Sequence, residues 1–586
     1  MAESSQVAAP GGRVPPLWRW LVLALLAGSF LTVGLLQASQ DAPTVDEGVD
    51  LSSGVAGLVR HDLRMVPEHP PLGKAVAALS ALAAHPVVPD TAAYRAGDWF
   101  DWSDDFVSAN ERAGTLRPML VRARAVVLVE ALACSALLYL LGRRFFGPDR
   151  GLLAAATWLT TPYVVGLSHF AMIDVPFTLA TLGVCVLLAR WRDRPTPTAS
   201  AALGVALGAT LATRHTGLVL VIVVVGSMAW VLRRVPRQVA QHVLGTGVLA
   251  LATVWVVYRG LAPSAPSGAV VGRFDGLVAS SGAGSPLSRL VTSLPLPLEW
   301  RAGFAYLDLT SADRPSSLFG HSWDGGRWWY FPASAALKLP LTLVVAVVTG
   351  WVLAGRSGCV RRRELAATVV VPALALWLFL VAQPLNLGLR LALPVVALAF
   401  VGVGGLVTVL ERTAAVADHR PVGRLRAGRP WAVAVGLVAT VQVVASVSAV
   451  PHSLAWTPVP WTPAYRWVSD ANLDAGQGLY ELRRWSRGRT VMVAIDSTRG
   501  LAVGGGTSPL SSVEPAEVRG WVAVGVTPLM QTRRRELAWL RKYCPVGTLA
   551  GGSVLLYRFR EAPDPAPGPE RPVEPCIGSR ASSATD

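Results

Sequence analysis

The sequence has few charged residues and almost no lysine. Asp, Glu, Lys and Arg make up 15% of its 586 residues, whereas hydrophobic residues make up 52% and the mean hydropathy is +0.44. Soluble domains carry about 25% charged residues, so this deficit excludes an ordinary soluble fold and indicates a chain in contact with lipid. Only Lys74, Lys338 and Lys542 represent lysine, and arginine supplies nearly all the other positive charge.

The sequence also lacks a separate basic domain, although its net charge is +16 and its pI is near 10.4. The arginines lie in short groups between apolar runs, a pattern that sets the orientation of membrane helices. A nucleic-acid-binding protein would instead gather them on one polar surface. We therefore expect a lipid bilayer as partner and no nucleic acid.

Long apolar runs are abundant, and an apolar helix of about 20 residues crosses a bilayer. As one helix, residues 199–232 would reach about 50 Å, too long for one crossing, so we place two spans there with the turn "TRHTG" between them. The first run exceeds a signal-peptide core, and we interpret it as a retained span. The sequence thus predicts about eleven spans: Leu17–Ala38, Met119–Leu141, Gly151–Leu167, Ile173–Ala189, Ala199–Thr213, Leu218–Leu232, Val239–Leu261, Ala333–Leu353, Leu365–Ala382, Leu391–Leu410 and Trp431–Val450.

The charges of the loops predict how these spans are oriented in the membrane. With eleven spans, every short loop on one side is rich in arginine, as the positive-inside rule requires of the cytoplasmic side. We therefore expect a cytoplasmic N-terminus and an extracytoplasmic C-terminus in a multi-pass protein of the cell membrane. The outer side then holds two long loops, about 40–118 and 262–332, and the region after Pro451. The cytoplasmic arginines are Arg143, Arg144, Arg150, Arg190, Arg192, Arg194, Arg233, Arg234, Arg237, Arg356, Arg361, Arg362, Arg363, Arg412, Arg420, Arg424, Arg426 and Arg429.

The ionisable residues that call for explanation gather on the outer side. Few charges fall deep inside the spans, whereas a proton-coupled transporter tends to bury its acids near the midplane. The pattern favours a site that opens on one membrane face. The candidates are Asp46, Glu47, Glu68, His69, Lys74, His169, Asp174, Arg214, His215, His321, Lys338 and Arg390.

Each of these residues also has an ordinary interpretation. Adjacent acids such as Asp46 and Glu47 usually form a solvated or helix-capping surface. Asp174, in "HFAMIDVP", is either a helix cap or a carboxylate held rigidly at the membrane surface. His69 is a surface histidine, a phosphate ligand, or part of a divalent-cation site. Glu68 and His321 would be its fellow ligands, but the spacing matches no closed zinc motif.

Several stretches, taken in order, resemble one family of membrane enzymes. "VDEG…EHPPLGK", "HFAMIDVP", "ATRHTGL", "WWYFPASAALKLP" and "NLGLRLALP" are similar to motifs of the GT-C fold glycosyltransferases. The nearest groups are the protein O-mannosyltransferases and aminoarabinose transferases. A later stretch, "VSDANLDAGQGLYELRRW", is similar to a "DSNLDWGQDL" segment of bacterial relatives. The fold class expected is thus an all-α polytopic membrane protein of GT-C type, with a small extracytoplasmic α/β domain at the C-terminus.

The resemblance implies transfer of one sugar from a polyprenyl-phosphate donor on the outer face. The family's acidic pair corresponds to Asp46 and Glu47, with Asp46 as catalytic base, and its second-loop acid to Asp174. Its basic positions correspond to Arg214, Lys338 and Arg390. The sequence departs from the family in three places: His69 stands where the aminoarabinose group has lysine, Ala475 where relatives have tryptophan, and Gly478 where they have aspartate.

Chemistry supports the same interpretation. The outer side has no nucleotide sugars, so an activated sugar must arrive on a membrane lipid, and its phosphate leaving group needs cations. Arg214, Lys338 and Arg390 are candidates, with His69 and Lys74 beside them. A carboxylate base could contribute about 100- to 10,000-fold, and one displacement would invert the anomeric carbon. The accessory or acceptor-side candidates are Glu68, His169, His215 and His321. No cofactor is certain, although a divalent cation is possible.

The region after Pro451 is more polar. "TVMVAID", "GWVAVGV" and "SVLLYRF" predict strands, and Leu479–Trp485 and Arg533–Tyr543 predict helices. We divide the chain into a catalytic membrane domain (1–450), an α/β domain (451–561) and a proline-rich disordered tail (562–586). Cys544 and Cys576 could form a disulfide on that side. The expected function is an inverting glycosyltransferase acting on an extracytoplasmic protein, lipid or envelope glycan. A polytopic transporter or lipid flippase, or an assembly scaffold, remains the alternative.

Overall fold

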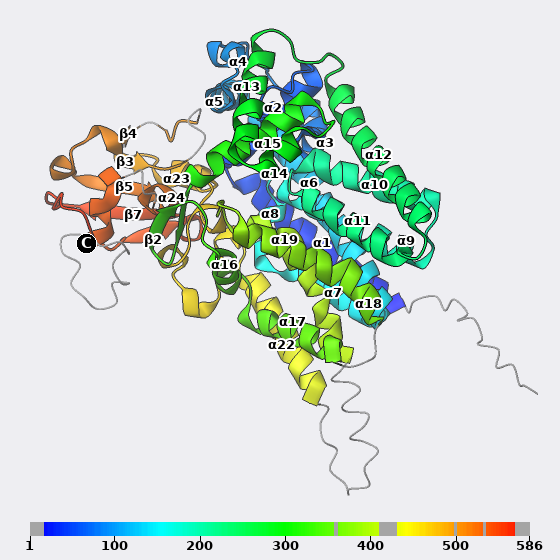
Figure 1. The fold of residues 1–586 in the computed structure, drawn as a ribbon. Coiled ribbons are helices and arrows are strands. Elements are labelled where there is room, and N and C mark those ends of the chain that lie inside the picture. Colours follow the sequence, from blue (N-terminus) through cyan, green and yellow to red (C-terminus); the bar gives the residue numbers. More distant parts are fainter. Residues whose placement is uncertain are drawn as a thin grey trace, which may run out of the picture.

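The computed structural model describes residues 17–356, 361–408, 430–496, 501–504, 506–530 and 535–568. Most of the described chain is helical, and a bundle of helices makes up the larger part of the molecule (Figure 1). The C-terminal strands form a separate sheet at one side of that bundle, on the left of Figure 1. The candidate site lies where these two parts meet.

Six helical segments in the described residues are long and apolar enough to cross a membrane. They coincide with predicted spans, and the chain is a multi-pass membrane protein. The six are α1 (Leu17–Gln40), α6 (Leu116–Phe146), α9 (Asp174–Asp193), α12 (Pro236–Leu261), Arg362–Ala382 and Leu389–Thr408. The fifth comprises α18 (Arg362–Leu365), η3 (Ala366–Val370) and α19 (Val371–Ala382), and the sixth begins with η4 (Leu389–Ala392) and α20 (Leu393–Phe400).

The other predicted spans are shorter helices or are broken in two. Proline accounts for the breaks, because it disfavours helix at the residue before it and cannot donate its own hydrogen bond. Pro162 follows the break at Thr161, and Pro340 lies between α16 and α17. The count of eleven therefore stays a prediction. These helices are α7 (Pro148–Thr160), α8 (Pro162–Ser168), α10 (Pro197–Thr213), α11 (Gly217–Leu232), α16 (Tyr330–Lys338), α17 (Leu341–Arg356) and α22 (Pro430–Ser448).

Ion pairs mark one end of the bundle. Arg144, near the end of α6, pairs with Asp193 at the end of α9 at 2.7 Å, and also with Glu364 of α18. Arg19 of α1 pairs with Asp149 of α7 at 2.6 Å. All of these lie at the end where the sequence predicts arginine-rich cytoplasmic loops. Asp174 begins α9, so it lies about 30 Å along the helix from this end.

The two long loops that the sequence assigns to the outer side are largely helical. Pro71 is the first residue of α3, a position where proline is favoured because its missing N–H has no partner there. The first loop contains α2 (Val45–Val59), α3 (Pro71–Ala81), η1 (Leu82–Ala84), α4 (Ala92–Ala96) and α5 (Trp99–Arg112). The second contains α13 (Ala269–Gly284), α14 (Pro286–Thr292), α15 (Leu298–Thr310), η2 (Ser311–Asp313) and a hairpin of β1 (Pro315–Leu318) and β2 (His321–Asp324).

The C-terminal region carries a five-stranded mixed sheet with the order β4-β3-β5-β7-β6. Strand β3 pairs in parallel with β4 and β5, while β7 pairs antiparallel with β5 and β6. The three predicted strands are confirmed as β3 (Val491–Ala494), β5 (Gly520–Gly525) and β7 (Val554–Phe559), and β4 (Thr507–Pro509) and β6 (Gly547–Leu549) are added. The predicted helix at Leu479–Trp485 is α23, and α24 (Val526–Met530) follows β5.

Short 3₁₀ turns connect these elements, and the end of the chain is only partly described. The predicted helix at Arg533–Tyr543 corresponds to a 3₁₀ helix in its described part. Cys544 is disulfide-bonded, but Cys576 lies outside the described residues with most of the predicted tail, so the pairing stays a prediction. The turns are η5 (Ser453–Ala455), η6 (Val459–Trp461), η7 (Ala464–Arg466), η8 (Asp470–Asn472), η9 (Leu510–Ser512), η10 (Pro515–Glu517), η11 (Arg535–Lys542) and η12 (Ala550–Gly552).

Candidate active site

Asp46 lies in the first turn of α2, whose start is fixed by a capping box. The Thr44 hydroxyl accepts a hydrogen bond from the Glu47 amide, and the Glu47 carboxylate accepts one from the Thr44 amide. Successive residues of a helix point about 100° apart, so Asp46 and Glu47 face different surroundings. The Asp46 side chain is 38% exposed, whereas that of Glu47 is 0% exposed.

Asp46 forms an ion pair with Arg390. Burial alone would raise the pKa of the Asp46 carboxyl, but the Arg390 guanidinium outweighs burial and holds that pKa below its ordinary value. The carboxylate is therefore ionised at neutral pH and held next to a cation. The predicted base and a predicted phosphate-binding arginine thus meet directly, although 344 residues separate them.

Glu47 has a different environment, since both of its oxygens are fully used. Arg124 of α6 donates from Nε to Oε1 at 2.7 Å and from Nη2 to Oε2 at 2.7 Å. The Ala171 amide donates to Oε1 at 2.8 Å and the Thr44 amide to Oε2 at 2.9 Å. Burial opposes ionisation of Glu47, but Arg124 outweighs it and lowers the carboxyl pKa. These contacts favour a role in fixing α2, and hence Asp46, rather than contact with substrate.

Asp174 is the first residue of α9 and is paired with the turn between α10 and α11. Arg214 Nη1 donates to Asp174 Oδ1 at 2.8 Å, and the Asp174 side chain is only 3% exposed. The charges of Asp46, Asp174 and Asp470 all act on Arg390. Arg390 is therefore the centre of a cluster of three carboxylates from three separate parts of the chain.

A glycine turn presents Arg390. Gly388 has φ 78°, and a Cβ built on it would lie 2.9 Å from the Ala471 Cβ, so the turn requires glycine for both backbone and space. The Tyr330 hydroxyl accepts the Gly388 amide at 2.8 Å, and Asn472 Oδ1 accepts the Leu389 amide at 2.9 Å. This explains why the "NLGLR" stretch contains a glycine two residues before its arginine.

His69 and Lys74 form a second cationic group at the start of α3. His69 Nδ1 lies 2.7 Å from Asp50 Oδ1. Burial disfavours the charged imidazole, but Asp50 outweighs it and raises the His69 pKa. Lys74 Nζ donates to the Val66 carbonyl at 2.9 Å, and burial lowers its pKa to about 8. The His69 charge also acts on Asp46, which places this group next to the carboxylate cluster.

The remaining candidates have structural partners. Glu68 pairs with Arg314. Lys338 is fully buried, and its ammonium donates to the Leu454 carbonyl at 2.7 Å and to the Trp456 carbonyl, so in this conformation it holds the chain after Pro451 rather than facing a donor.

Three histidines complete the predicted set. His169 Nε2 lies 2.9 Å from Asp41 Oδ2 in a buried position. His215 packs against Trp300, and burial lowers its pKa to about 3, so its imidazole is neutral. His321 begins β2 on the exposed side of the hairpin.

The described residues do not assemble the divalent-cation site that the sequence left open. Among those residues, no three His, Cys, Asp or Glu side chains gather in a way that could hold a metal ion. Glu68 is engaged by Arg314 and His69 by Asp50, so two of the three metal candidates already have partners. A metal therefore stays a sequence prediction for this chain.

Sequence reasoning missed the residues that join the C-terminal region to the site. The Ala42 amide donates to the Gln477 carbonyl at 3.0 Å and the Val45 amide to the Ala475 carbonyl at 3.2 Å, directly before Asp46. Asn472 holds the Arg390 turn. The stretch 470–477 thus contacts both halves of the Asp46–Arg390 pair. Its similarity to the "DSNLDWGQDL" segment was the available signal, but it did not reveal these contacts.

Asp50, Arg124 and Arg314 were also missed. Each is the charged partner of a residue that the motifs did identify: Asp50 of His69, Arg124 of Glu47 and Arg314 of Glu68. A single sequence gives no sign of such pairs, because the partners come from different elements. The assembled site is a carboxylate cluster around one arginine, with a histidine–lysine group beside it. It can hold an anion next to an ionised base.

Comparison with known proteins shows which family model part of the chain matches and which fold it shares. Residues 119–258 match the family model described as dolichyl-phosphate-mannose-protein mannosyltransferase. No curated protein matches the chain. The oligosaccharyltransferase of Archaeoglobus fulgidus in its apo form shares the fold, with a TM-score of 0.50 and 11% identity over 91% of this chain and 74% of that one.

Two further structures show weaker similarity. ArnT from Cupriavidus metallidurans, bound to undecaprenyl phosphate, has a TM-score of 0.44 and 14% identity over 92% of this chain and 97% of that one. The arabinosyltransferase EmbB from Mycobacterium smegmatis has a TM-score of 0.28 and 16% identity over 74% of this chain and 44% of that one. The resemblance found in the motifs is confirmed: the chain has the GT-C glycosyltransferase fold and matches the dolichyl-phosphate-mannose-protein mannosyltransferase family over residues 119–258.

Proposed function

We propose that the protein is a glycosyltransferase that moves a single sugar from a polyprenyl-phosphate donor to an acceptor outside the cytoplasm. The observation that carries this proposal is the Asp46–Arg390 ion pair, with the charges of Asp174 and His69 acting on it. An arginine at the membrane surface suits a phosphate leaving group, and an ionised carboxylate beside it suits a base for the acceptor.

The donor phosphate would bind between Arg390 and the His69–Lys74 group. Arg390 offers a planar guanidinium, which matches phosphate oxygens, and the raised pKa of His69 keeps an additional positive charge available. As the bond from the anomeric carbon to the phosphate breaks, negative charge grows on the phosphate. Arg390 and His69 are placed to stabilise that charge.

The acceptor would approach from the side of Asp46 and Asp174. Asp46 is the proposed base, and Asp174, fixed by Arg214, would orient the acceptor hydroxyl. One displacement at the anomeric carbon inverts its configuration. We expect the product to show inverted stereochemistry, and a retained configuration would exclude a single displacement.

The decisive experiment compares the wild-type chain with Asp46→Asn. Purified protein in lipid nanodiscs is incubated with labelled polyprenyl-phosphate mannose and polyprenyl-phosphate arabinose and with a cell-envelope fraction as acceptor. We expect wild-type protein to transfer label from one donor, and Asp46→Asn to lose at least 100-fold of that activity while it still binds polyprenyl phosphate. A flippase or scaffold would not respond to this substitution, and transfer at the wild-type rate by Asp46→Asn would refute the proposal.

A further inference from the structure

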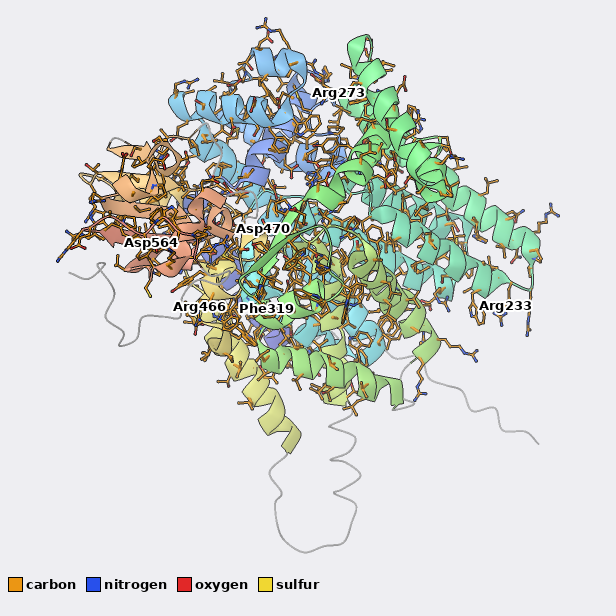
Figure 2. The ribbon with its side chains drawn as sticks, turned by 60° about the vertical axis from the view of Figure 1, so that its left-hand side comes forward. Arg233, Arg273, Phe319, Arg466, Asp470 and Asp564 are labelled. Carbon is orange, nitrogen blue, oxygen red and sulfur yellow. The ribbon has the colours of Figure 1, made fainter. Side chains whose placement is uncertain are left out.

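Asp470 is a carboxylate of the candidate site to which the sequence motifs gave no role. It is the first residue of η8, in the stretch that contacts both the α2 start and the Arg390 turn. Figure 2 shows Asp470 in the middle of the molecule, whereas Asp564 lies farther out on the side of the C-terminal sheet. Its charge acts on Arg390, and the charge of Asp46 acts on it in turn.

The backbone holds Asp470 in an uncommon conformation. Its φ is 51°, in the left-handed region that a residue other than glycine seldom adopts. Contacts on both sides impose this geometry: the Asp470 amide donates to the Thr527 hydroxyl at 3.0 Å, and Asn472 accepts the Leu389 amide at 2.9 Å. Strain of this kind persists only where the surroundings enforce it, and it clusters at functional sites.

One oxygen of the Asp470 carboxylate has no hydrogen-bond partner among the residues that the structure describes. This oxygen, Oδ2, is buried, whereas the two oxygens of Glu47 accept four hydrogen bonds. A buried carboxylate oxygen without a hydrogen bond destabilises a protein. Its presence within a cluster of carboxylates therefore indicates a function as a hydrogen-bond acceptor. An incoming hydroxyl is the donor that such an acceptor lacks.

Asp46 and Asp470 share Arg390 unequally. Asp46 is ion-paired with Arg390, and this lowers its pKa and makes it a weak base. Burial raises the pKa of Asp470 to about 6, against the attraction of Arg390 and with the repulsion of Asp46 and Asp496. Two neighbouring carboxylates whose pKa values are pushed apart in this way commonly divide a catalytic task.

We propose that Asp470 is a further catalytic residue, whose unpaired oxygen takes the proton that leaves the acceptor hydroxyl during sugar transfer. This inference rests on the proposed function and moves the acceptance of the proton from Asp46, where the sequence motifs placed it, to Asp470. The acceptor oxygen forms its bond to the anomeric carbon as the bond from that carbon to the carrier phosphate breaks. The electron pair of the broken bond leaves on the phosphate, and the proton moves to Asp470 Oδ2. Asp46 keeps Arg390 in place and aims the hydroxyl.

The test uses Asp470→Asn in the full-length chain. Asparagine is nearly isosteric and tolerates the left-handed region, so it removes the base without adding backbone strain. Asp564→Asn is the matched control, because Asp564 pairs with Lys542 away from the site. The assay measures kcat/KM for transfer from the labelled polyprenyl-phosphate sugars across pH 5 to 9, together with binding of polyprenyl phosphate.

We expect Asp470→Asn to lose about 100-fold or more in kcat/KM, while Asp564→Asn stays at the wild-type value. Wild-type kcat/KM should fall as the pH drops below about 6, because a protonated Asp470 cannot accept a proton. This acidic limb should be absent from the residual activity of Asp470→Asn. The groups that face Asp470 are Arg390, Asp46, Asp474, Asp496 and Tyr330. Ionised Asp46 and charged Arg390 do not titrate in this range, but burial raises the pKa of Asp474 to about 7, so the limb is assigned to Asp470 by its disappearance in Asp470→Asn.

Three outcomes would overturn the inference. One is an Asp470→Asn variant with wild-type kcat/KM, and another is a variant that is slow but keeps the acidic limb. The third is loss of folding in both Asp470→Asn and Asp470→Glu, which would make the residue structural. A wild-type chain that transfers no label would refute the proposed function itself, whereas an active wild type with an indifferent Asp470→Asn refutes only the role of Asp470.

Discussion

Replacing Glu47 by glutamine should destabilise the protein strongly, although the substitution preserves size and shape. Glu47 and Arg124 are 0% and 1% exposed, so the change leaves a buried guanidinium without its counter-charge. The glutamine amide also places an NH₂ against either the Ala171 or the Thr44 amide, where a carboxylate oxygen now accepts. Removing one partner of a buried ion pair costs about 3–5 kcal/mol, a large part of the 5–15 kcal/mol that stabilises a typical domain.

Thermal unfolding of the detergent-solubilised protein measures this effect. The control is Asp46→Asn, one residue away, whose side chain is 38% exposed and whose partner Arg390 keeps the charges of Asp174 and Asp470 nearby, so the loss of stability should be smaller. Glu47→Gln should lower the unfolding temperature by many degrees and Asp46→Asn by few. Both substitutions should strongly lower transfer activity. A Glu47→Gln variant as stable as wild type would refute the assignment of Glu47 as the residue that fixes α2.

Two further predictions concern partners of the site. Asp50→Asn should weaken binding of polyprenyl phosphate at pH 7, because Asp50 outweighs burial and keeps the His69 pKa raised. The charge on His69 is present below its pKa and is lost as the pH rises, so the pH at which binding weakens should be lower in Asp50→Asn than in the wild type; an unchanged pH dependence would contradict this. Asn472→Ala should cost about 1–3 kcal/mol in unfolding free energy and lower activity, because the Leu389 amide loses its acceptor. Unchanged thermal unfolding would remove Asn472 from the account.

The apolar runs, the order of the motifs and the position of Asp46 could be predicted from the sequence, because hydropathy and helix start signals are local. The separation of Asp46 from Glu47 could not. It depends on where α2 begins and on Arg124, which lies 77 residues away. The environment of Lys338, which the motifs predicted to face the donor, could not be predicted for the same reason. Its partners, the carbonyls of Leu454 and Trp456, follow more than 100 residues later.

Asp470 illustrates a second limit. Its importance depends on a left-handed backbone and on one oxygen that has no hydrogen-bond partner within the described part of the chain, and neither can be deduced from the letters "SDANLD". Similarity to the "DSNLDWGQDL" segment marked the stretch without indicating which residue faces the site. Long-range packing, rather than local propensity, decides which of the acids in such a motif is available for chemistry.

The central claim is that the phosphate of a lipid carrier binds at Arg390, among the carboxylates of Asp46, Asp174 and Asp470. A structure determined by cryo-electron microscopy with polyprenyl phosphate tests this most directly. We predict phosphate density within hydrogen-bonding distance of the Arg390 guanidinium and next to His69. Phosphate bound at the opposite end of the bundle, for example on Arg144, with Arg390 still enclosed by its carboxylates, would contradict the account.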